Sequence, residues 1–209
     1  MKGKGQKQTI MVSSTVYGIE ELLDRIYTIL TIFGYEVWMS HKGTVPVSSQ
    51  RTAFENCLAA TEKCDLFLGL MTPHYGSGVD QKDGLSITHQ EIRRAIELKK
   101  PRWLLAHENV TFAWSLLKNL GYADKGSRQA LKLKKSPILD DLRVLDLYEE
   151  AIVHGVPLAD RQGDWVQRFR TTDDGQLFVT SQFGRYQEVE QFIKENFEQG
   201  VALDDGGDS

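Results

Sequence analysis

Short apolar runs alternate with longer amphipathic segments through the first half of the chain. Runs of this kind, bounded by polar residues, predict strands that are covered on both faces, as in a parallel sheet. Four of them are evident, at residues 9–13, 35–39, 65–70 and 102–106. Each is separated from the next by a segment long enough for a helix, which is the order that a parallel sheet requires.

The segments between these runs carry apolar residues at helical spacing. The first has a continuous stripe and ends at Gly34, a residue suited to the position just after a helix. Its apolar residues are Ile19, Leu22, Leu23, Ile26, Ile29, Leu30 and Phe33. Further helices are expected at 50–62 and 87–99. The alternation predicts an α/β fold of three layers, in which helices flank a central, mostly parallel sheet of about five strands.

The second half of the chain has a weaker pattern. We expect these elements there: a helix at 112–120, a mobile basic insertion at 121–135, an edge strand at 165–169 and a helix at 185–197. Ser136 and Pro137 suit a helix start, but residues 138–152 fit either one helix or a helix, a strand and a helix. The chain would then divide into a flexible basic arm (1–8), an α/β core (9–109), an extension that completes the domain (110–197) and a disordered acidic tail (198–209).

The composition and net charge limit the partners and the cellular location that we expect for the protein. The chain is 41% hydrophobic and 26% charged, with a formal net charge of −4, which argues against a nucleic-acid partner. No apolar run approaches the ~20 residues that span a bilayer, so we expect no membrane partner. Cys57 and Cys64 have no zinc-like spacing and suit core thiols in a reducing cytosol, which predicts a cytoplasmic protein. The spacing of the histidines implies no metal site.

Candidate binding residues gather near the expected carboxyl ends of the strands, where α/β sheets bind ligands. Ser13, Ser14 and Thr15 offer hydroxyl and N–H groups that suit a phosphate or ribose, or else a simple turn and helix cap. Trp38 and Tyr75 have aromatic rings that suit stacking on a nucleotide base, or else ordinary packing against other residues of the protein. The remaining candidates at this edge are Tyr17, Gly69, Ser86 and His89.

Glu91 interrupts the apolar stripe of the expected helix at 87–99, where it follows Ile87 and precedes Ala95. Two interpretations are open. Thr88 and Glu91 have the spacing of a capping box, in which the carboxylate binds the backbone N–H of the cap residue. Alternatively, the side chain points into the cleft at the strand ends, where it would meet a ligand.

A set of spaced motifs resembles a bacterial family of unassigned function, related in fold to Toll/interleukin-1 receptor (TIR) domains and nucleoside 2-deoxyribosyltransferases. The resemblance covers roughly residues 9–109, and its motifs are Ser13-Ser14-Thr15, Cys64-Asp65, Ser86-Ile87-Thr88 with Glu91, and Lys100-Pro101. It implies a flavodoxin/TIR-like fold. In both better-known relatives a helix-borne Glu at this place handles an N-glycosidic bond, so the resemblance implies that Glu91 is catalytic.

The resemblance further implies NAD or a related nucleotide as the small-molecule partner, bound as a substrate and not as a cofactor. By analogy with TIR domains, the protein would self-associate through helices and act as a bacterial stress or anti-phage effector. The alternative is a module without catalysis that binds a nucleotide signal or a partner protein.

Overall fold

The computed structural model describes residues 7–76, 78, 84–134, 136 and 138–198. Most of the expected basic arm and of the expected acidic tail therefore lies outside the described residues, and so does Pro137. Among the helices of the described part, none is long and apolar enough to cross a membrane.

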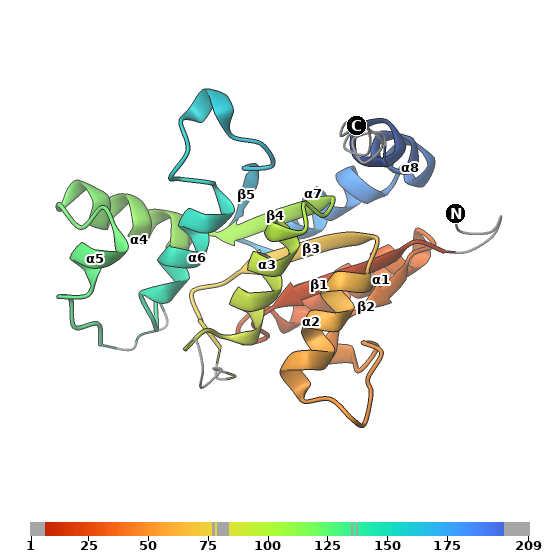
Figure 1. Cartoon of the computed structure of the whole chain (residues 1–209), viewed down its shortest axis with the longest axis horizontal. Helices are drawn as coiled ribbons and strands as arrows, with labels where there is room; N and C mark the ends of the chain where they lie inside the picture. Colours follow the sequence, from red (N-terminus) through yellow and green to blue (C-terminus); the bar gives the residue numbers. More distant parts are fainter. Residues whose placement is uncertain (1–6, 77, 79–83, 135, 137, 199–209) are drawn as a thin grey trace, which may run out of the picture.

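Five parallel strands form one sheet, in the order β2-β1-β3-β4-β5. Figure 1 shows the sheet between two sets of helices, which confirms the predicted three-layer, flavodoxin-like fold. The fifth strand lies at the edge of the sheet, where the sequence predicted it. The strands are β1 (Thr9–Ser14), β2 (Glu36–Trp38), β3 (Leu66–Met71), β4 (Arg102–His107) and β5 (Val166–Phe169).

Each face of the sheet has its own helices and its own apolar core. One core joins the sheet to α1 (Glu20–Ile32), α7 (Thr172–Phe183) and α8 (Tyr186–Ile193). The opposite core joins it to α2 (Ala53–Lys63), α3 (Ile87–Glu97) and α6 (Arg143–Ala151). At one end of the molecule, α4 (Glu108–Asn119) and α5 (Lys125–Arg128) lie beside α6 (Figure 1). Shorter helical turns lie at Ser40–Lys42, Leu158–Asp160 and Lys194–Glu198.

Alternation along β1 decides which of its residues face the site described below. Ile10 and Val12 belong to the core beneath α1, whereas Met11 belongs to the core beneath α2 and α3. Successive side chains of a strand point to opposite faces, so Ser13 shares the face of Met11. The first residue of the Ser13-Ser14-Thr15 motif is therefore directed toward α3.

The C-terminal half differs from the prediction at two points. The helix expected from Ser136 begins only at Arg143, after a bent segment in which the Asp141 carboxylate accepts the Arg143 N–H at 2.9 Å. A single short helix thus lies within residues 138–152, for which the sequence allowed either one helix or a helix, a strand and a helix. Helix α7 was not predicted, because only Gly175, Val179 and Phe183 are buried along its length.

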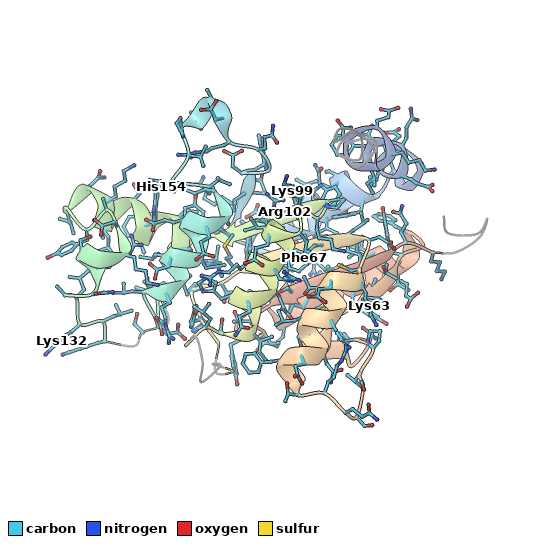
Figure 2. The ribbon with its side chains drawn as sticks, viewed as in Figure 1. Lys63, Phe67, Lys99, Arg102, Lys132 and His154 are labelled. Atoms are coloured by element: carbon cyan, nitrogen blue, oxygen red, sulfur yellow. The ribbon has the colours of Figure 1, made fainter. Side chains whose placement is uncertain are left out.

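The expected basic insertion contains α5 and one buried cation. Arg128 is 3% exposed and forms ion pairs with Asp146 at 2.7 Å and Glu149 at 2.5 Å. It therefore anchors the segment to α6. Lys132 does project outward beyond α5 (Figure 2). The mobility of residues 121–135 stays a prediction.

Candidate functional site

The candidate site lies where the carboxyl ends of β1 and β3 meet. These strands are neighbours in the sheet, and the strand order changes direction between them. The helix after β1 covers one face and the helix after β3 covers the other. Such a switch point opens a crevice that is the usual ligand site of a doubly wound sheet.

The N-terminus of α3 rules out the capping role of Glu91. Ser86 is the cap residue: it has extended backbone angles, and its hydroxyl accepts the His89 N–H at 3.2 Å. Thr88 is therefore already inside the helix, and the expected capping box between Thr88 and Glu91 is wrong. Ser86 is as good a cap as Thr88, and Glu91 lies on the buried face of the helix with Ile92 and Ala95.

Glu91 is buried against β1 and α2, with 3% of its surface exposed. The Ser13 hydroxyl donates a hydrogen bond to Oε2 at 2.5 Å. Burial raises the pKa of Glu91 to about 7, although the Ser13 hydroxyl and the neighbouring Cys57 thiol both lower it. Among the described residues, Oε1 has no hydrogen-bond partner. The carboxyl group is thus held by one oxygen and can exchange a proton near neutral pH.

A small cavity of about 10 Å³ lies beside the N-terminus of α3, with room for one water molecule. Its polar lining comes from Thr15, Thr72, His74, Tyr75, Ser86 and Thr88. The hydroxyls of Thr15 and Thr72 are hydrogen bonded to each other, and both lie within hydrogen-bond distance of the His74 carbonyl, which accepts from the hydroxyl that does not donate to its neighbour. The loop after β1 is therefore tied to the loop after β3 beside the cavity.

Contacts through Tyr75 and His89 connect the wall of the cavity with α6. The Tyr75 hydroxyl lies 2.8 Å from His89 Nδ1, and the backbone N–H of Ser86 donates to it at 3.3 Å. On its other side, His89 Nε2 lies 3.3 Å from Oε1 of Glu150. Burial raises the pKa of Tyr75, so its hydroxyl stays protonated and can donate. Both residues are predicted to contact substrate, and in the structure both are buried and hydrogen bonded to protein groups.

Glu150 is the charged end of this chain of contacts. Burial raises its pKa, but His89 and Arg93 outweigh that effect and bring the pKa down to about 2. Arg93 donates to both carboxylate oxygens, at 3.0 and 2.6 Å. Glu150 therefore stays ionised at any ordinary pH and accepts hydrogen bonds only.

The model of one protein family, described as Domain of unknown function (DUF4062), matches residues 9–141, well over half of the 209-residue chain. The chain belongs to this family. No curated protein matches the chain. The DUF4062 description carries no activity, so the function must be argued from the site itself.

Seven of the predicted site residues, Glu91, Ser13 and His89 among them, do not line the cavity. The Ser14 hydroxyl donates to the Thr15 carbonyl at 2.8 Å, and Tyr17 is 63% exposed. Trp38 packs in the core beneath α2 and α3, and its indole N–H donates to Glu36 at 2.9 Å. Gly69 lies within β3, where a Cβ atom would stand 3.2 Å from Ile92 of α3. Gly69 therefore brings helix and sheet close together and contacts no ligand space.

The structure also adds residues that the sequence did not single out. Thr72 directly follows β3, and its position at the carboxyl end of a strand could have identified it as a candidate site residue. Cys57 was predicted only as a core thiol, and burial together with Glu91 raises its pKa to about 12. Nothing in the local sequence marks Arg93 or Glu150 as a site residue. The helices that carry them, α3 and α6, lie far apart in the chain and come into contact only in the folded protein. Among the described residues, no group of three or more His, Cys, Asp or Glu is placed to hold a metal ion.

Proposed function

We propose that the protein cleaves the N-glycosidic bond of NAD or a related nucleotide, with Glu91 as the carboxyl group that meets the ribosyl carbon. The observation that carries this proposal is the state of Glu91. It is a buried carboxyl group at the switch point of a parallel sheet, it does not cap its helix, and one of its oxygens has no hydrogen-bond partner in the described part. A perturbed carboxyl in such a place is a candidate for chemistry.

The chemistry of the bond suits this carboxyl group. Breaking the bond leaves positive charge on the ribosyl carbon, and a nearby carboxylate stabilises that charge or forms a covalent intermediate with the carbon. A dry surrounding makes this electrostatic stabilisation larger than it is in water. The Ser13 hydroxyl, which holds Oε2, leaves Oε1 as the atom that would face the sugar.

Substrate entry requires that the walls of the crevice move apart. The cavity beside α3 has a volume of about 10 Å³, much smaller than a nucleotide. The hydrogen bond between Thr15 and Thr72 joins two residues of its wall and would have to break. Opening of this kind is common in enzymes that exclude water during the reaction.

The test is to incubate the purified protein with NAD and with related nucleotides at pH 7 and to follow release of nicotinamide or of the corresponding base. We expect turnover with at least one of them. Because self-association is a further expectation, the assay should span low and high protein concentrations. Absence of release at every concentration, with every nucleotide, contradicts the proposal.

The closed state of the crevice favours a second candidate function, a binding module without catalysis. Glu91 is only 3% exposed, and the hydroxyls around the cavity are bonded to protein groups. A nucleotide that binds only the folded state would raise stability by about 2.7 kcal/mol at a hundredfold excess over Kd. Thermal stabilisation by a nucleotide, without turnover, would favour this candidate over the enzyme.

A further inference from the structure

Two small residues, Ser13 of β1 and Gly69 of β3, lie side by side in the sheet beneath α3. They are partners in the register of the two strands, so their Cβ positions point to the same face. A Cβ atom at Gly69 would stand 3.2 Å from Ile92, the residue that follows Glu91. The missing side chain therefore lets α3 approach the sheet at the level of Glu91. This approach brings the carboxyl group within reach of the short serine side chain.

The contact between Ser13 and Glu91 is shielded from water. Ser13 is 2% exposed and Glu91 is 3% exposed, and the Ser13 hydroxyl oxygen lies 2.5 Å from Oε2. A hydroxyl that donates to a carboxylate stabilises its ionised form, and more so where water is excluded. Burial raises the pKa of Glu91 to about 7, and of the two groups that lower it the Ser13 hydroxyl has the larger effect. Ser13 thus opposes the effect of burial.

The other titratable groups of the helices that pack against α3 leave this role to Ser13. The Cys57 thiol of α2 lies beside Glu91, but its pKa of about 12 keeps it neutral, and a thiol is a weak donor. Glu62 of α2 and Glu150 of α6 each form an ion pair with an arginine of α3. Neither β1 nor β3 contains a titratable residue. The hydroxyl of Ser13 is therefore the main group that favours the charge of Glu91.

The proposed reaction needs Glu91 in its ionised form. A carboxylate stabilises positive charge on the ribosyl carbon or forms a bond to it, whereas a protonated carboxyl group has neither the charge nor the same nucleophilicity. With a pKa of about 7, roughly half of the molecules carry the carboxylate at pH 7. Any loss of stabilisation of the ionised form then lowers the rate directly.

We propose that Ser13 is a positioning residue for the reaction, which holds Glu91 as a carboxylate, and that Gly69 makes this contact possible; this inference rests on the proposed function. Ser13 acts through Glu91 and needs no contact with the substrate. The nitrogen of the leaving base keeps the electron pair of the broken bond, while the Ser13 hydroxyl donates to Oε2 throughout and keeps its own proton.

The experiment measures nicotinamide release from NAD between pH 6 and pH 9 by the full-length wild type, Ser13→Ala and Thr61→Val. Thr61→Val is the matched control, because Thr61 is 0% exposed and its hydroxyl donates to the backbone carbonyl of Cys57 at 3.1 Å. We expect the midpoint of the pH–rate profile to rise by about one pH unit in Ser13→Ala. The rate at pH 7 then falls about fivefold and recovers by pH 9. Thr61→Val should keep the wild-type midpoint.

A titration without substrate separates this inference from the proposed function. The Glu91 carboxyl resonance, followed by ¹³C NMR and assigned by its absence in Glu91→Gln, should titrate at higher pH in Ser13→Ala than in the wild type. Gly69→Ala should shift it in the same direction, because a raised α3 lengthens the hydrogen bond. If Ser13→Ala does not fold, Ser13→Cys in reducing buffer provides a weaker donor of similar shape, and we expect a smaller shift of the same sign.

Three outcomes would overturn the inference. A wild type without turnover overturns the proposed function and the role of Ser13 in the reaction with it. Turnover that depends on Glu91, with a midpoint unchanged in Ser13→Ala, overturns the role of Ser13 alone. A loss of rate in Ser13→Ala that stays constant from pH 6 to pH 9 also overturns it, since the residue would then be structural. An unshifted resonance in a folded Gly69→Ala overturns the part assigned to Gly69.

Discussion

Replacing Glu91 by Gln should change how the stability of the protein depends on pH. Gln keeps the size of the side chain and can still accept the hydrogen bond from Ser13, but it cannot ionise. In the wild type, burial raises the pKa of Glu91 from 4.5 to about 7. The native state therefore holds this proton more tightly than the unfolded state does.

The sign follows from proton binding in the two states. Between pH 4.5 and pH 7 the unfolded chain has lost the proton of Glu91 while the native state keeps it. Stability falls with pH wherever the native state binds more protons. The stabilisation by the protonated group is complete below pH 4.5 and is lost as the pH rises through 7. At about 1.4 kcal/mol for each pKa unit, the wild type should lose about 2–3 kcal/mol between pH 5 and pH 8 relative to the variant.

The assay is urea unfolding of the wild type and Glu91→Gln at pH 5, 6, 7 and 8. Glu97→Gln is the matched control, because it removes a carboxylate of the same helix that lies at the surface. The difference in unfolding free energy between Glu91→Gln and the wild type should grow with pH. Two curves that stay parallel from pH 5 to pH 8 would refute the burial of an ionisable Glu91.

Three further predictions concern the scaffold, each measured by urea unfolding at pH 7. Gly69→Ala should cost about 1–3 kcal/mol from overpacking, because the new methyl would stand 2.8 Å from Leu104; Gly155→Ala, with open space around it, is the control. Ser86→Ala should cost about 1 kcal/mol as a lost helix cap, and a larger cost in Thr88→Ala would contradict the assignment of the cap. Arg128→Met should cost about 1–3 kcal/mol, because the partly buried carboxylates of Asp146 and Glu149 lose their ion pair. The control for it is Lys132→Met, which changes an exposed cation, and equal effects would refute the anchoring role of Arg128.

The sheet could be predicted because its strands are apolar runs that can be recognised in the local sequence. Runs such as residues 9–13 and 65–70 are apolar on both faces, and only a parallel sheet covered by helices buries them fully. Helix α7 lacked such a signal, since its buried face consists of Gly175, Val179 and Phe183. The late start of α6 was missed because Asp141 binds the backbone N–H of Arg143, a local contact that competes with a helix begun at Ser136.

The candidate site was predictable only in part. The place of Glu91 in an apolar stripe indicated that it faces inward, but its contact with Ser13 was not predicted. The choice between capping and the crevice depended on whether Ser86 or Thr88 caps the helix, and both residues are good caps. Glu150 could not be found, because its contact with His89 joins helices that lie far apart in the chain.

The central claim is that Glu91 carries the chemistry, and nicotinamide release by wild type and Glu91→Gln at pH 7 tests it most directly. The reaction should be measured beside Glu97→Gln, with thermal stabilisation by NAD recorded for each protein. The account predicts that Glu91→Gln loses at least about 100-fold in rate while NAD still stabilises it, and that Glu97→Gln keeps the wild-type rate. Turnover by Glu91→Gln at the rate of the wild type would contradict the account.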